Sequence, residues 1–269
     1  MEIFSLALLN LKDEMHQEGC PLCRCFLRAE TGFLRSLDWE NINEVGTRMR
    51  LTQSLGACRR HAQQMLQMEV AAWETPLGNG ILYEGLTKAV SCRLQETRSL
   101  AEKQSRRGWA RRLLARLVGR GKRSERLERP LTPEEICRIC KVGQESVRLH
   151  AETLLEMLAY PEYQALYERS QGVCLPHLRL LCQVAQPGPG LQYLLQQSAR
   201  RLESLETDLS EYLRKQSYQY HHEPVSEGER TAIARALAFF GGSEAAASPS
   251  IGQEYEEVSI GGSSVHKDW

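Results

Sequence analysis

The chain has 269 residues, of which 34 are Lys or Arg and 34 are Asp or Glu, so its formal net charge is zero. A chain of this size has length for one large core or two smaller ones, and its neutral charge removes the simplest argument for a protein that coats nucleic acid with its whole surface. No apolar run approaches the ~20 residues that span a bilayer, and the N-terminal residues lack the basic segment of a signal peptide. Nine cysteines, an odd number, favour thiols or metal ligands in a reducing cytoplasm over a disulfide framework.

Helical periodicity runs through most of the sequence and predicts an all-α fold. In chain order, the predicted helices cover residues 3–17, 23–38, 43–53, 58–73, 80–104, 133–159, 161–169, 174–185, 190–216 and 227–240. Thr132 followed by Pro133 is typical of a helix start, and Ser226 with Glu229 predicts a capping box. The segment 241–269 is rich in Gly, Ser and Glu and is predicted to be a disordered tail.

Three motifs occur twice, in the same order and at similar spacing. They are C-x2-C, S-x-G-x-C-x-x-H and Gly-x-Gly before a long helical segment, found first at 20–23, 54–61 and 78–80, and again at 137–140, 170–177 and 188–190. Such repetition predicts two tandem copies of one helical unit. The predicted organisation is a first copy at 1–102, a basic linker at 103–130, a second copy at 131–216 and a C-terminal helix at 217–240.

Each copy contains three cysteines and one histidine at spacings typical of a zinc site. A C-x2-C supplies two thiolates from a tight turn, and a C-x2-H on the first turn of a helix supplies two more ligands, because residues i and i+3 share a face. The predicted quartets are Cys20, Cys23, Cys58 and His61 in the first copy, and Cys137, Cys140, Cys174 and His177 in the second. The 34 and 33 residues between the two half-sites suit a helical hairpin. The crossed pairing, in which the C-x2-C of one copy meets the C-x2-H of the other, stays open from sequence.

The predicted cofactor is zinc, two ions per chain. A closed four-ligand site leaves no position for a substrate, so the expected role of the metal is structural. The alternatives are an iron–sulfur cluster, thiol–disulfide chemistry suggested by the redox-like Cys-Pro-Leu-Cys at 20–23, and unrelated buried thiols and imidazoles.

The remaining cysteines and three of the histidines lack ligand-spaced partners. Cys25, Cys92 and Cys182 are predicted to be buried core residues, although Cys25 is close enough to Cys23 to replace it as a ligand. The histidines are predicted to be ordinary surface or core residues, and they are His150, His221 and His222.

The most charged stretch, residues 103–129, contains eleven Lys or Arg against two Glu. A helix here would place Trp109 and several leucines opposite Arg111, Arg112 and Arg116. Such a helix could bind an anionic membrane, nucleic-acid phosphates or another protein. The preferred interpretation is a solvated linker whose apolar face packs on its own domain.

Four motifs taken together resemble an uncharacterised bacterial family, number 6062 in the series of domains of unknown function. They are Cys-Pro-Leu-Cys at 20–23, Cys-Arg-Arg-His-Ala at 58–62, Gly-Asn-Gly-Ile-Leu-Tyr-Glu at 78–84 and Cys-Leu-Pro-His at 174–177. The resemblance covers most of residues 1–240 and implies a bacterial cytoplasmic protein of about this size with no established activity. The second C-x2-C departs from the pattern, with Arg138 where proline would be expected.

The sequence contains no G-x-S-x-G, P-loop, Rossmann or H-E-x-x-H motif. The predicted function is therefore a non-enzymatic, zinc-stabilised helical adaptor or regulator. One alternative is an iron–sulfur or thiol-based redox protein or enzyme, in which the Gly-Asn-Gly at 78–80, flanked by Glu74, Tyr83 and Glu84, would hold an anion rather than form a simple turn. The second alternative is nucleic-acid or membrane-surface binding through the basic linker.

Overall fold

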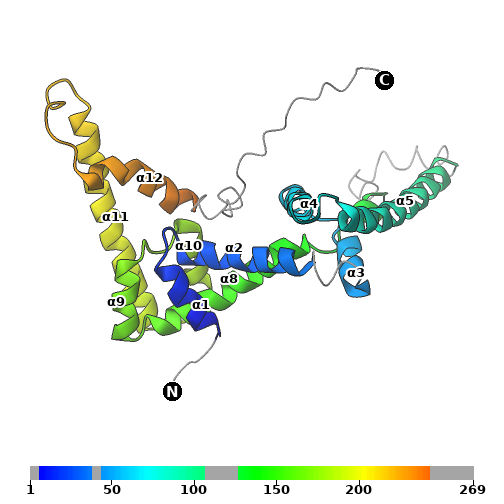
Figure 1. The fold of residues 1–269 in the computed structure, drawn as a ribbon, viewed down its shortest axis with the longest axis horizontal. Coiled ribbons are helices and arrows are strands. Elements are labelled where there is room, and N and C mark those ends of the chain that lie inside the picture. The colour runs from blue at the N-terminus through cyan, green and yellow to red at the C-terminus, as the bar shows by residue number, and fades with distance from the viewer. Residues whose placement is uncertain (1–5, 38–43, 107–126, 243–269) are drawn as a thin grey trace, which may run out of the picture. The chain divides into compact units, whose positions relative to one another are not determined.

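The computed structural model describes residues 6–37, 44–106 and 127–242, and within these ranges it contains ten α-helices, a short 3-10 helix and no strand (Figure 1). The elements are α1 (Leu6–Met15), α2 (Pro21–Ser36), α3 (Val45–Gln53), α4 (Arg59–Trp73), α5 (Leu77–Arg106), η2 (Arg129–Leu131), α8 (Arg138–Met157), α9 (Pro161–Arg169), α10 (Leu175–Val184), α11 (Pro189–Lys215) and α12 (Glu227–Gly241). The all-α prediction is confirmed, and each predicted helix has a counterpart. The predictions for the core of the basic linker (107–126) and for the tail beyond residue 242 lie outside the described residues.

None of the helices in the described ranges is long and apolar enough to cross a membrane.

The helix start predicted at Thr132 and Pro133 is wrong, because α8 begins five residues later, at Arg138. The backbone N–H groups of Glu134 and Glu135 donate to the carbonyl oxygen of Gln53, at 2.8 and 3.4 Å, instead of entering a helical turn. This tertiary pairing outweighs the local helix-start signal, and Cys137 consequently lies immediately before α8. The capping box predicted from Ser226 and Glu229 is present at the start of α12.

The chain packs as two compact units. Unit 1 consists of Met1–Leu27 and Val147–Trp269, and unit 2 consists of Arg28–Ser146. The chain passes from unit 1 to unit 2 inside α2 and returns inside α8. The units therefore differ from the predicted copies, since the N-terminal segment packs with the second half of the sequence.

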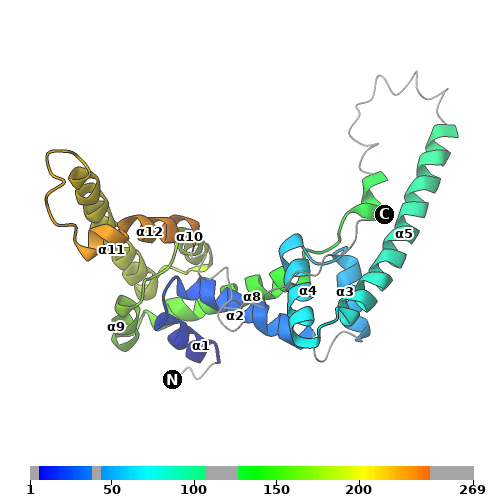
Figure 2. The same cartoon turned by 45° about the horizontal axis from the view of Figure 1, so that its top comes forward.

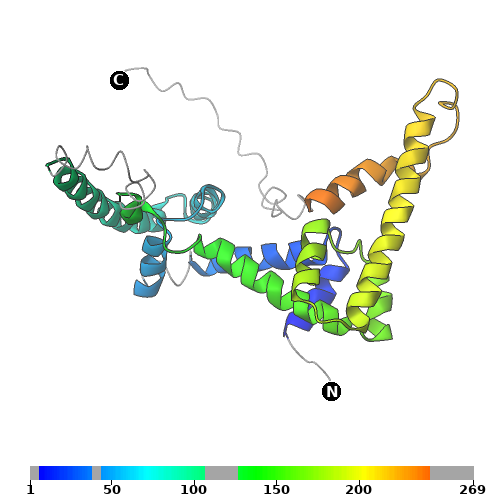
Figure 3. The same ribbon diagram turned by 180° about the vertical axis from the view of Figure 1, so that it is seen from behind.

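Unit 1 has an extensive apolar core. Leu11 of α1, Leu154 and Leu158 of α8, Leu181 of α10 and Leu194 of α11 are completely buried in it. Helix α12 contacts both α11 and α10, and Figure 3 shows it running from α11 back toward α10.

Unit 2 is built around α5, which contacts α3, α4 and η2 (Figure 2). Within the described part of this unit, the buried core cluster is small and consists of Leu34, Leu37, Met65, Leu82 and Ile139. Unit 2 therefore has less apolar burial to stabilise it than unit 1 has.

Candidate metal centres

The structure gathers all eight predicted ligands into two clusters, but it pairs the half-sites the other way. The Cys20 cluster, in unit 1, contains Cys20, Cys23, Cys174 and His177. The Cys58 cluster, in unit 2, contains Cys58, His61, Cys137 and Cys140. The quartets predicted within each copy are therefore wrong. The crossed pairing, left open by the sequence, is the one that the structure contains.

The within-copy pairing fails because the intervening helices are unequal in length. Helix α2 has 16 residues and α3 only 9, which correspond to about 24 and 14 Å of helix. The same holds for α8, with 20 residues, and α9, with 9, about 30 and 14 Å. The second helix is thus only about half as long as the first, and by itself it does not return the chain to the cysteines at which the first helix began.

Every half-site lies at the N-terminus of a helix. The carbonyl groups of Cys20, Cys58, Cys137 and Cys174 each accept the first helical hydrogen bond, from the N–H group four residues later, at 2.8 to 3.2 Å. The second ligand of each half-site, three residues on, lies in the first turn. Because the N-terminus is the positive end of a helix dipole, two helices direct positive potential at the sulfurs of each cluster.

The S-x-G-x-C segment sets the direction of each C-x2-H helix. Ser54 and Ser170 are the C-caps of α3 and α9, and each hydroxyl donates to a carbonyl group of the helix that it ends. Gly56 and Gly172 then adopt φ values of 103° and 78°. Only glycine enters this region without strain, which explains its place two residues before each cysteine.

In each cluster the four donor atoms all lie within 4.8 Å of one another, as they would around a single ion. In the Cys20 cluster, His177 Nδ1 lies 3.2 Å from Cys174 Sγ and 3.4 Å from the sulfurs of Cys20 and Cys23. Cys23 Sγ and Cys174 Sγ are 3.7 Å apart. Zinc–sulfur and zinc–nitrogen bonds of about 2.3 and 2.0 Å give tetrahedral edges of about 3.8 Å between sulfurs and about 3.5 Å between sulfur and nitrogen.

The Cys58 cluster has the same geometry. His61 Nδ1 lies 3.2 Å from Cys58 Sγ, 3.3 Å from Cys140 Sγ and 3.5 Å from Cys137 Sγ. Cys58 Sγ and Cys140 Sγ are 3.8 Å apart. Both donor sets, three thiols and one imidazole, therefore fit one zinc-sized ion.

Both clusters stabilise positive charge next to their sulfurs. Burial opposes a high pKa for His177, but hydrogen bonds with Cys174 and Cys23 outweigh it and raise that pKa to about 9. Burial likewise opposes a high pKa for His61, and contacts with Cys137 and Glu30 raise it to about 9.

Within each cluster the pKa values of the cysteine thiols differ. In the Cys20 cluster, hydrogen bonds with Cys174 and Cys20 hold the pKa of Cys23 well below its usual range, whereas burial, helped by the neighbouring sulfurs, raises the pKa of Cys20. In the Cys58 cluster, burial works to raise the pKa of Cys137, but the hydrogen bond with His61 lowers it to about 6. Burial and the charge of Cys137 raise the pKa of Cys140 to about 12.

A buried carboxylate supports the histidine of the Cys58 cluster. Glu30 Oε1 lies 3.0 Å from His61 Nε2, and Arg60 Nη2 lies 2.6 and 2.8 Å from the two oxygens of Glu30. A carboxylate at Nε2 favours the tautomer that leaves Nδ1 free to bind a metal. Within the described ranges, His177 has no such carboxylate. The sequence signal for Glu30 was its place two turns after Cys23 on α2.

The Gly-Asn-Gly segment already holds an anion that belongs to the chain itself. The buried carboxylate of Glu69 accepts the backbone N–H groups of Gly78 and Asn79, and it also accepts the Asn79 side-chain amide at 2.6 Å. The segment therefore anchors the start of α5 on α4.

The predictions for the cysteines and histidines outside the two clusters are only partly confirmed. Cys25 is buried as predicted and lies outside the clusters, but Cys92 and Cys182 are exposed, so the core prediction is wrong for both. The wrong assignments arose because a cysteine that binds no metal and forms no disulfide is usually buried. His150 is buried, whereas His221 and His222 are exposed.

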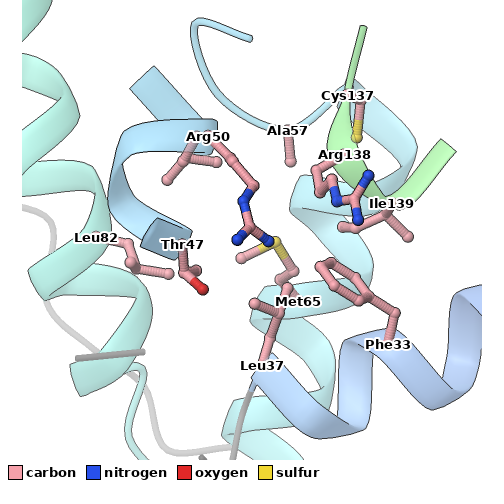
Figure 4. A pocket seen from close by; sticks show the side chains of 11 residues that line it. Phe33, Leu37, Thr47, Arg50, Ala57, Met65, Leu82, Cys137, Arg138 and Ile139 are labelled. Carbon is pink, nitrogen blue, oxygen red and sulfur yellow. The ribbon is translucent and has the colours of Figure 1, made fainter. Parts of the chain in front are cut away.

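A mainly apolar hollow adjoins the Cys58 cluster. Figure 4 shows Phe33, Met65 and Ile139 around it, with Arg50 reaching in and Cys137 at its edge. Its open volume is about 30 Å³, room for one or two water molecules.

Fold and clusters together define an all-helical protein with two Cys3His clusters that could each hold a metal ion. Residues 4–247 match the model of a family of unknown function, DUF6062, and the chain belongs to that family. The resemblance found from the motifs is thereby confirmed. No curated protein and no solved structure matches the chain.

Proposed function

We propose that the protein is a non-enzymatic helical adaptor or regulator whose two units are each stabilised by one zinc ion. The observation that carries this proposal is the agreement of the donor distances in both clusters with the edges of a zinc tetrahedron.

Zinc would be held by Cys20, Cys23, Cys174 and His177 in unit 1 and by Cys58, His61, Cys137 and Cys140 in unit 2. In both clusters the four donors close the coordination, so the metal would tie helix N-termini together without binding a substrate. Each ion would also join parts of the chain that are far apart, since 150 residues separate Cys23 from Cys174.

Donor spacing also favours a single ion over the alternatives. An iron–sulfur cluster contains several iron and sulfide atoms, so its cysteine ligands lie further apart than the ligands of one ion. The nine cysteines are all free in the structure, and the C-x2-C motifs follow no β-strand in the described ranges, unlike a redox C-x2-C.

We further propose that the two halves are copies of one ancestral unit. The helices α2 to α5, with 16, 9, 15 and 30 residues, correspond in order to α8 to α11, with 20, 9, 10 and 27. The half-sites occupy the same places in both series. Crossed pairing then exchanges half-sites between copies, as a domain-swapped dimer does between chains.

Elemental analysis of serine variants tests the metal and the pairing together. The full chain should carry two zinc ions, and Cys20→Ser should lose one. The double variant Cys20→Ser/Cys174→Ser should still keep one ion, whereas Cys20→Ser/Cys58→Ser should lose both. The opposite pattern would restore the within-copy pairing, and bound iron with a visible charge-transfer band would refute the zinc proposal.

A cleavage experiment tests the crossed pairing without changing a ligand. A protease site introduced into the basic linker would allow the chain to be cut into two fragments. Each cluster would then contain one half-site from the first fragment and one from the second. The cleaved halves should stay together while zinc is bound, and removal of zinc by a chelator should weaken their association. Separation in the presence of zinc would contradict the crossed pairing.

A further inference from the structure

A cavity of about 250 Å³ lies inside unit 1, against the Cys20 cluster. Its walls come from the loop before α10, from α11 and from α12, and Cys20 and Cys174 form part of them. Two arginines, Arg201 and Arg235, line the cavity. Apolar side chains complete it, among them Leu202, Leu205 and Phe239.

Arg201 brings a positive charge that no acidic side chain neutralises in the described ranges. Its Nη2 donates only to backbone carbonyl groups, those of Tyr167 at 2.7 Å and Glu168 at 3.3 Å. The carboxylate of Glu168 accepts instead from Tyr193 at 2.8 Å and from Gln197 at 3.1 Å. Nη1 of Arg201 is buried without a hydrogen-bond partner.

Arg201 is also held rigidly in place. Its guanidinium carbon lies 4.8 Å from the centre of the Tyr167 ring. Gly172 lies directly beneath Nη1, and a Cβ atom at this position would overlap that nitrogen. The lack of a Cβ atom at Gly172 therefore makes room for the arginine, and it also permits the positive φ of the turn before Cys174.

Arg235 adds a second cation from α12. Its Nη2 donates to Asp208 Oδ2 at 2.6 Å and to the carbonyl group of Gly228 at 2.7 Å, but its Nε is buried without a partner. Asp208 therefore pairs with Arg235, and it leaves the charge of Arg201 without a carboxylate in the part of the chain that the structure describes. Buried N–H groups without acceptors are rare in native proteins, and a bound ion is one reason for them.

We propose that this cavity binds a small organic oxyanion, a phosphate or carboxylate group attached to an apolar body. Guanidinium groups form charge-assisted hydrogen bonds with both kinds of oxyanion. The apolar wall of Leu202, Leu205 and Phe239 accommodates the body of the molecule, and a largely apolar pocket with a few fixed polar groups is the usual form of a small-molecule site. The assignment does not depend on which metal the Cys20 cluster holds.

Calorimetric titration of the zinc-loaded full chain tests the site with three probes: phenyl phosphate, benzoate and inorganic phosphate. Phenyl phosphate or benzoate should bind more tightly than inorganic phosphate, because only these two contain an apolar group that fills the apolar part of the cavity.

Arg201→Gln should weaken the binding of the organic probes by about tenfold or more, since hydrogen bonds to charged groups are strong. The matched control is Arg200→Gln, which removes an exposed arginine from the same helix and should leave affinity unchanged. Zinc content, measured in parallel, should stay the same in both variants, so failure here is distinguishable from failure of the zinc proposal.

Hydrogen exchange of the unaltered chain provides a second readout if Arg201→Gln does not fold. The organic probe should protect residues 167–174 and 198–205. The proposal is overturned if none of the probes binds, if Arg201→Gln binds as well as the unaltered chain, if inorganic phosphate binds as tightly as the organic probes, or if protection appears only in the basic linker.

Discussion

The two clusters have the same donors and the same geometry, yet the units around them differ. Among the residues that the structure describes, sixteen buried ones form the core cluster of unit 1, including Cys20 and Cys174 themselves, whereas five form that of unit 2. Apolar burial is the main source of folding free energy, so unit 2 has less to stabilise it without a metal. Two metal sites with the same donors are therefore expected to contribute different shares of the stability of their units, depending on the core that surrounds each site.

Metal removal should have the largest effect, and it should be unequal. Structural zinc contributes about 10–16 kcal/mol of apparent free energy, as much as the whole stability of a domain. Cys58→Ser should therefore unfold unit 2, whereas Cys174→Ser should leave part of unit 1 folded. Hydrogen exchange measured by mass spectrometry would show lost protection across α3 to α5 in the first variant and retained protection in α8 and α11 in the second. Equal loss of protection in both units would show that the size of the apolar core does not decide how strongly each unit depends on its metal.

The two Gly-x-Gly motifs differ in what the last glycine contacts. A Cβ at Gly190 would overlap the carbonyl oxygen of Leu155, so the residue allows α11 to approach α8 closely. A Cβ at Gly80 would meet nothing within 4 Å. Gly190→Ala should lower the free energy of unfolding by about 1–3 kcal/mol, and Gly80→Ala should raise it by about 0.5–1 kcal/mol. Chemical denaturation of the zinc-loaded variants measures both, and equal effects would contradict the structural difference.

The carboxylate beside His61 distinguishes the Cys58 cluster from the Cys20 cluster. Glu30→Gln should weaken zinc binding there by about 10- to 100-fold, because the glutamine orients the imidazole less strongly. In a Cys20→Ser background, which leaves only this site, competition with a chromophoric chelator gives the affinity. Glu14→Gln is the control, since Glu14 is a similarly buried carboxylate that pairs with Arg24 in unit 1. An unchanged affinity in Glu30→Gln would mean that Glu30 only pairs with Arg60.

A loss of stability without loss of metal is expected at Glu69. Glu69→Gln keeps the shape of the side chain but replaces one of the oxygens that accept N–H groups at the start of α5. The free energy of unfolding should fall by about 1–3 kcal/mol, as expected when a buried hydrogen-bonding partner is lost. Zinc content should stay at the same level, and a loss of metal would instead show that α4 and α5 hold the Cys58 cluster together through this contact.

Much of the site could be predicted from the sequence, because the residues that form each half-site are close together in the chain. Cysteine and histidine three residues apart at a helix start share a face wherever that helix packs, so the eight ligands could be named from spacing alone. The helices followed from apolar periodicity in the same way. The predicted helices 133–159 and 161–169 already differed greatly in length, which was a signal against a hairpin within each copy.

Determined by the sequence alone were the ten helices, the glycine turns and the identity of the eight donors, since each depends on residues within one or two turns of one another. Contacts between distant parts of the chain set which half-sites meet, where α8 begins, that Glu30 supports His61 and that Glu69 occupies the Gly-Asn-Gly segment. The physical reason is that these contacts join residues brought together by the burial of two separate cores, and such burial depends on the lengths and directions of whole helices.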